Sequence, residues 1–224
     1  MPSPLARRDL LAAGAAGLAG AAVLGLAGAR TASADRAFDV QLLQTAASIE
    51  NALVSAYETI VALPVLGSPP TAKLKELLTN ARNHHGDHAK AFNDAVGKLG
   101  GRPQTAPNPT VAQTAGRARL AEVSQIVDLT HDLETVAAQT YQNDVGLLED
   151  LNARKLSASI LAVEAQHAAA LGVIRALLSA SQPDLIGTDT GSIFRFPPDA
   201  PRAGSPDSFT PVELARPAAE GAIR

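Results

Sequence analysis

Apolar residues in the middle of the chain recur at alternating spacings of three and four, which is the period of an amphipathic helix. Four segments show this pattern, over residues 39–63, 71–99, 120–148 and 153–178. Pro64 and the Gly67–Pro70 run end the first segment, and Gly100-Gly101 ends the second. The pattern therefore predicts four helices, each about 37 Å long at about 1.5 Å per residue.

The connections between these helices predict how they are arranged. Two links are short, whereas the link over 102–110 is longer and predicts a crossover between the second and third helices. Aromatic residues make up only 3% of the chain and alanine and leucine dominate, a composition that favours closely packed helices over a sheet. We expect an all-α fold, a four-helix bundle over residues 35–182.

The N-terminal 34 residues have the features of an export signal. Arg7-Arg8 precedes an apolar, Gly/Ala-rich run that continues to about Ala29, and Ala32-Ser33-Ala34 supplies a cleavage site before Asp35. The segment resembles a bacterial twin-arginine signal, with an ordinary secretory signal as the alternative. We expect a periplasmic, cell-envelope or extracellular protein with no stable membrane span after cleavage.

The rest of the composition narrows the functional classes. Residues 183–224 are rich in Pro, Gly, Ser and Asp and show no period, so they predict an irregular Pro-rich tail. The absence of cysteine excludes disulfides, thiolate zinc sites and iron–sulfur clusters. A net charge of -3 gives no indication of a nucleic-acid partner. No serine–histidine–aspartate spacing or phosphate-binding loop indicates a hydrolase or a kinase.

The two halves of the chain repeat one arrangement of polar residues. In each half a glutamate is followed seven residues later by a tyrosine, and a pair of residues three apart, ending in histidine, follows on the next helix. The residues are Glu50, Tyr57, His85 and His88 in the first half, and Glu134, Tyr141, Glu164 and His167 in the second. The chain has no other tyrosine, so a duplication of a helix pair explains the pattern better than chance.

Six of these residues are candidate metal ligands because they lie on or beside the apolar rows. They are Glu50, His85, His88, Glu134, Glu164 and His167. A single such glutamate is more typical of a surface position, and a single such histidine of a hydrogen-bonded core. Together, however, three buried carboxylates need compensation, and the inward rows contain no lysine or arginine. A divalent cation would neutralise the carboxylates, with imidazoles completing its ligands.

With these residues the chain resembles the exported bacterial ferritin-like domain proteins of the ferritin-like superfamily, over about residues 39–178. The resemblance implies a ferritin-like four-helix bundle with a dinuclear iron or manganese site. It also implies that Glu50 and Glu134 are single-carboxylate ligands, that Glu164 bridges the two ions and that His167 caps one of them.

His85 departs from that family pattern, which has glutamate at this position. An imidazole cannot bridge two ions at the short separation that a carboxylate permits, so the number of ions, one or two, stays open. Two further histidines are less favoured as ligands. His84 sits at the edge of the apolar row, and His131 lies one turn before Glu134.

Two functions follow from these observations. The first is an exported protein that binds iron or manganese and oxidises ferrous iron or reduces peroxide. The second is a non-enzymatic, stress- or desiccation-associated bundle with an altered or lost metal site, which His85 favours. A weaker third idea is a binding module whose tail engages the cell envelope. The expected partners are metal ions, and a homo-oligomer is left open.

Overall fold

The structure is a computed structural model that describes residues 32–181 and 211–223. The signal segment up to residue 31 and the tail residues 182–210 lie outside the described residues. Helices account for all the regular structure that is described, with no strand among these residues. The elements are α2 (Ala32–Val61), η2 (Pro64–Leu66), η3 (Pro69–Thr71), α3 (Ala72–Lys98), α4 (Pro109–Arg117), α5 (Val123–Leu147) and α6 (Leu151–Ser179). The prediction of an all-helical fold is therefore confirmed.

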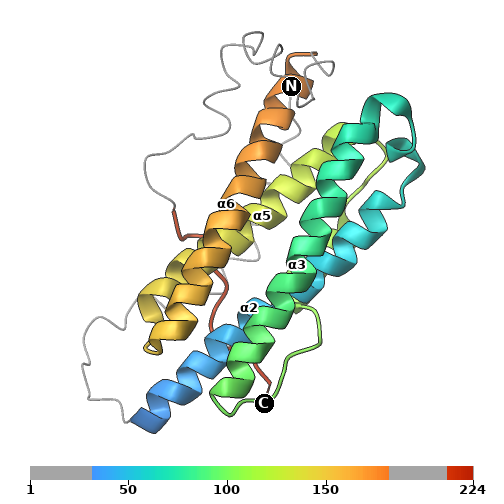
Figure 1. The fold of residues 1–224 in the computed structure, drawn as a ribbon. Coiled ribbons are helices and arrows are strands. Elements are labelled where there is room, and N and C mark those ends of the chain that lie inside the picture. The colour runs from blue at the N-terminus through green and yellow to red at the C-terminus, as the bar shows by residue number, and fades with distance from the viewer. Residues whose placement is uncertain (1–31, 182–210, 224) are drawn as a thin grey trace.

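The four long helices lie side by side as two pairs, α2 with α3 and α5 with α6 (Figure 1). The pairs contact each other through α2 against α5 and through α3 against α6. Each pair comes from one half of the internal repeat, so the repeated polar residues of the two halves face one another across the interface between the pairs.

The ends of the helices follow from local sequence signals. Pro64 and Pro69 lie in the two short 3-10 turns between α2 and α3. Gly100 follows α3 with a φ of 80°, a conformation that glycine adopts without steric cost. Asp150 caps α6, because its carboxylate accepts from the backbone N–H groups of Asn152 and Ala153, each at 2.9 Å.

The link between α3 and α5 differs from the longer connection without a helix that the sequence analysis expected. It contains the nine-residue helix α4, which packs on α2 and was not predicted. Asn108 caps α4 by accepting from the N–H groups of Thr110 and Val111 at 3.1 Å, and Pro109 is its first residue. An Asn-Pro pair at this position is a recognised start signal for a helix. The long helices also differ at their ends, since α2 already begins at Ala32 and α5 begins only at Val123.

The core fills the space between the two pairs with large apolar side chains. The largest fully buried side chains are Tyr57, Tyr141, Phe92, Leu42, Leu43, Ile49, Leu53, Ile60, Leu66, Leu78, Ile126 and Leu148. Burying each such side chain stabilises the fold by about 1.5–3 kcal/mol. This apolar packing surrounds the polar residues at the centre.

Residues 211–223 pack against α2 and α5 as an irregular segment. The Thr45 hydroxyl donates to the carbonyl of Ala218 at 2.6 Å, and the backbone N–H of Leu214 donates to the Gln139 side chain at 2.9 Å. Gly221 approaches α2 so closely that a Cβ atom there would lie 2.0 Å from the Ser48 hydroxyl oxygen. Only glycine fits this contact, and the segment covers the α2–α5 side of the molecule.

Among the described residues, α6 is the one helix long and apolar enough, by length and composition, to cross a membrane. Core helices of water-soluble proteins share these properties. The buried face of α6 carries Glu164 and His167, and the helix packs along α5. The buried polar pair identifies this face as part of the protein interior.

Candidate metal site

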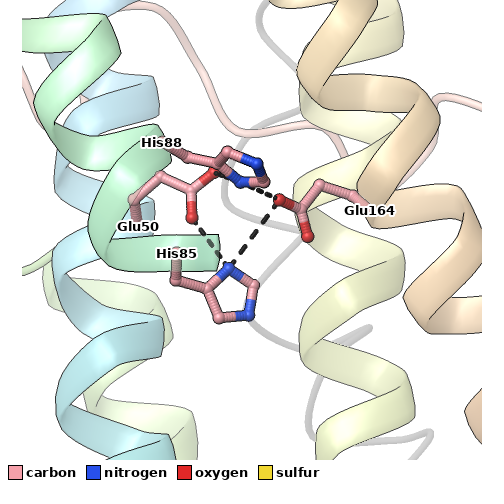
Figure 2. Close-up of side chains that lie close together, drawn as sticks. All are labelled: Glu50, His85, His88 and Glu164. Carbon is pink, nitrogen blue, oxygen red and sulfur yellow. Dashed lines mark hydrogen bonds and ion pairs between the residues drawn. The ribbon is translucent and has the colours of Figure 1, made fainter. Parts of the chain in front are cut away.

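The structure brings all six candidate ligands together at the centre of the four long helices. They come from α2 (Glu50), α3 (His85 and His88), α5 (Glu134) and α6 (Glu164 and His167). Figure 2 shows Glu50 from α2, His85 and His88 from α3 and Glu164 from α6 pointing toward one another. The carboxylates and His85 are fully buried, whereas the side chains of His88 and His167 are 13% and 10% exposed.

These residues form two overlapping donor sets. The first donor set is Glu50, His85, His88 and Glu164, and the second donor set is His85, Glu134, Glu164 and His167. Within each set, one potential ligand atom from every residue lies within 4.8 Å of the others. His85 and Glu164 belong to both sets, so the helix pair of each repeat contributes one shared residue.

His85 connects the two sets through both nitrogens of its ring. Its Nδ1 lies 2.9 Å from Glu50 Oε2, and its Nε2 lies 3.1 Å from Glu134 Oε1. Carboxylates in their ionised form only accept hydrogen bonds, so both nitrogens of His85 act as donors. Burial tends to lower the pKa of His85, but Glu134, Glu50 and Glu164 outweigh it and raise that pKa well above 6.5, which favours the ring with a proton on both nitrogens. His85 thus joins two carboxylates that come from different halves of the repeat.

The two tyrosines hold the same two carboxylates, and each reaches into the opposite half. The hydroxyl of Tyr57 donates to Glu134 Oε1, and the hydroxyl of Tyr141 donates to Glu50 Oε1 at 2.8 Å. The regular seven-residue spacing placed each tyrosine on the same helix face as the glutamate of its own half. Which carboxylate each hydroxyl contacts depends on how the pairs dock, and sequence spacing does not define that.

Several other polar atoms in the cluster are buried without a hydrogen-bond partner. They are Nδ1 of His88 and of His167, Oε2 of Glu134 and both side-chain oxygens of Glu164. His167 Nδ1 lies 3.3 Å from Glu164 Oε2 and 3.4 Å from Glu134 Oε2. His88 Nδ1 lies 2.6 Å from Glu164 Oε1, also outside hydrogen-bond geometry. Nitrogen and oxygen lone pairs that converge in this way fit a bound cation.

The electrostatics of the cluster reflect burial and the close packing of opposite charges. Burial tends to raise the pKa of Glu134, but the charge of His85 and hydrogen bonds outweigh it and hold that pKa well below 4.5. For Glu164, burial and the charges of the other two carboxylates raise the pKa to about 7. Burial tends to lower the pKa of His88 and His167, but the neighbouring carboxylates raise both values to about 9. A cation must therefore displace protons from these histidines in order to bind.

His84 is a member of this site that the sequence analysis did not favour. It is exposed, as its place at the edge of the row predicts, but its Nδ1 lies 3.1 Å from His167 Nε2. The two rings stack with centroids 5.3 Å apart. This contact fixes the orientation of His167, with Nδ1 toward the carboxylates. The sequence does contain a signal for this position, because His84 lies four residues before His88 and residues with this spacing share one helix face.

His131 lies outside the cluster. Its Nδ1 lies 3.4 Å from Asp132 Oδ1, and it belongs to neither donor set.

A comparison of the sequence with models of protein families tests the resemblance to ferritin-like proteins. The model of the ferritin-like domain family matches residues 38–179. The chain belongs to the ferritin-like domain family. The matched range includes α3, α4, α5, α6 and most of α2, and thus the entire Glu/His cluster. Searches of curated proteins and of solved structures found no match.

The shifted pKa values predict how the stability of the metal-free protein depends on pH. The folded protein holds protons on His88 and His167 up to a pKa of about 9, against an ordinary value of 6.5. Their stabilising contribution is complete below pH 6.5 and is lost as the pH rises through 9. Glu164, with a pKa raised to about 7, contributes with the same sign between pH 4.5 and 7. We expect the melting temperature in chelator to fall between pH 6.5 and 9, by about 2–4 °C per kcal/mol lost.

Thermal unfolding followed by circular dichroism measures this dependence. A variant with both His88→Gln and His167→Gln should show a flatter profile over the same range, because neither amide titrates. A melting temperature of the metal-free protein that rises or stays constant between pH 6.5 and 9 would contradict the charge assignment.

Proposed function

We propose that this chain is an exported ferritin-like protein that binds iron or manganese in the Glu/His cluster of a four-helix bundle. The proposal rests on a set of buried side-chain nitrogen and oxygen atoms that have no hydrogen-bond partner. These atoms belong to four residues of the cluster on three helices. Leaving such atoms unpaired costs about 1–3 kcal/mol each, and more for charged groups. A bound cation satisfies several of them at once.

The chemistry of the donors supports iron or manganese. The cluster offers only carboxylate oxygens and imidazole nitrogens, a combination that suits divalent first-row metals of intermediate hardness. Within the described residues, no lysine or arginine forms a salt bridge with the three carboxylates, so only the histidines of the cluster and a bound cation can offset their charge. Family membership agrees with this assignment.

The protein's own residues hold the carboxylates in place and limit the access of water. Tyr57 and His85 occupy Glu134 Oε1 and leave Oε2 turned toward His167. The partly exposed His88 and His167 mark the α3–α6 side as the route by which small molecules reach the cluster. A bound iron or manganese ion would supply redox chemistry with oxygen or peroxide, which is the basis for proposing ferrous iron oxidation or peroxide reduction.

A second function is favoured by the contacts of His85. Because both ring nitrogens already bond to carboxylates, the cluster is partly neutralised without any ion. A non-enzymatic bundle protein associated with stress or desiccation, with an altered metal site, is therefore the alternative. The two functions are distinguished by whether the protein with a bound ion turns over oxygen or peroxide.

Amide substitutions at the cluster test metal binding. Glu134→Gln and Glu164→Gln keep the size of the side chain but remove its charge, so each should weaken Mn²⁺ binding by more than about 100-fold. The measurements are isothermal titration with Mn²⁺ and the metal content of the purified protein. The metal-free Glu164→Gln variant should melt no lower than the wild type, because the change relieves repulsion among three buried carboxylates.

The matched control is Glu76→Gln on the surface of α3. Glu76 pairs with Lys73, and both side chains are 61% exposed, so the variant should bind Mn²⁺ like the wild type. Wild-type protein that binds neither Mn²⁺ nor Fe²⁺, or Glu134→Gln and Glu164→Gln variants that bind as tightly as the control, would refute the metal assignment.

Export is proposed from the sequence of the N-terminal segment. If the twin-arginine route carries the protein, replacement of Arg7-Arg8 by two lysines should abolish export, whereas the exported wild-type chain should begin at Asp35. Fractionation and N-terminal sequencing check both outcomes. Export that persists in the lysine variant would instead indicate an ordinary secretory signal.

A further inference from the structure

We propose that His85 takes the place of a second metal ion, so that the cluster binds a single divalent cation. In this arrangement Glu134, Glu164 and His167 hold the ion, while His85 and Glu50 form its rigid support. The inference rests on the proposed function, because it requires that the cluster binds metal at all. It goes further in assigning different roles to residues that the repeat makes equivalent.

The first support for the proposal is that His85 and Glu50 have no side-chain nitrogen or oxygen atom left free to bind an ion. Both nitrogens of His85 bond to carboxylates, at 2.9 Å and 3.1 Å. Both oxygens of Glu50 are also occupied, Oε2 by His85 and Oε1 by the Tyr141 hydroxyl at 2.8 Å. An ion in the first donor set would have to break these hydrogen bonds in a fully buried place.

The second support is the geometry of the unpaired atoms in the second donor set. Glu134 Oε2 and Glu164 Oε2 lie 3.4 Å and 3.3 Å from His167 Nδ1. Adjacent ligands of an ion bound at about 2.1 Å are about 3.0–3.4 Å apart, depending on the coordination geometry. The distance from His167 Nδ1 to each of these two oxygens is therefore already suitable for neighbouring ligands of one ion.

The first donor set lacks this spacing at its unpaired atoms. His88 Nδ1 and Glu164 Oε1 are only 2.6 Å apart, closer than neighbouring ligands of one ion, so an ion bound by both would have to push them apart. His88 thus lies beside the oxygen of Glu164 that faces away from His167. On the other side, His84 contacts Nε2 of His167 at 3.1 Å and directs its Nδ1 inward. Such outer contacts orient the ligands of many metal sites.

A glutamate at position 85 would remove this restriction. Its carboxylate could be shared by two ions, whereas both nitrogens of the His85 ring are engaged by Glu50 and Glu134. The identity of residue 85 therefore determines whether the first donor set can take an ion of its own.

The test is the number of Mn²⁺ ions bound by the intact wild-type protein and by His85→Glu. Isothermal titration gives the ratio, and electron paramagnetic resonance distinguishes an isolated Mn²⁺ ion from a pair coupled through a shared carboxylate. We expect one isolated ion per chain in the wild type, and two coupled ions in His85→Glu. The control His131→Glu makes the same chemical change outside the cluster and should bind one ion.

Two ions per wild-type chain would overturn the inference and leave the proposed function standing. A single ion in folded His85→Glu would also overturn it, because residue 85 would then not be what limits the count. No ion in the wild type would contradict the proposed function itself, and the inference with it. If His85→Glu does not fold, the wild-type ratio and its resonance spectrum still decide between one ion and two.

Discussion

Three carboxylates, Glu50, Glu134 and Glu164, are buried next to one another in the middle of the helices. Desolvating and crowding three negative charges is among the most expensive arrangements a protein interior can contain, unless positive charge and hydrogen bonds compensate it. Nearly every polar contact nearby supplies such compensation. His85 bonds to two of the carboxylates, the two tyrosines donate to the same two, and His88 and His167 approach the third.

The same constraint explains the form of the surrounding structure. The cluster needs groups from both halves of the repeat, so the two helix pairs must dock with Tyr57 facing Glu134 and Tyr141 facing Glu50. On the α2–α5 side, residues 211–223 and the Gly221 contact cover the seam between the pairs. On the α3–α6 side, the partly exposed His88 and His167 leave the cluster closer to solvent. One side of the molecule thus stabilises the site, and the other gives access to it.

Much of this could be predicted from the sequence, because helical period and inward phase are local properties. The 3–4 spacing of apolar residues predicted the four long helices, and the phase of each row indicated which glutamates and histidines would converge. It also favoured His85 over His84 as the inward residue, and the structure buries the first and exposes the second. Local signals had less power at the ends of helices and in the α3–α5 link, where α4 was missed although Asn108 and Pro109 mark its start.

The remaining features depend on contacts between residues far apart in the chain. Sequence spacing does not reveal that each tyrosine bonds to the glutamate of the other half, nor that His84 stacks on His167. The departure at His85 was visible in the sequence, but its consequence required coordinates. Only the structure shows that both of its nitrogens are engaged and that the unpaired atoms gather around Glu134, Glu164 and His167.

The location of a bound ion tests the central claim most directly. Crystals of the protein grown with Mn²⁺ and measured by anomalous diffraction at the manganese edge would show where the ion lies. We predict one anomalous peak within the cluster, in contact with Glu134, Glu164 and His167 and not with Glu50. A cluster that shows no peak in protein saturated with Mn²⁺ would contradict the claim that these buried residues form a metal site.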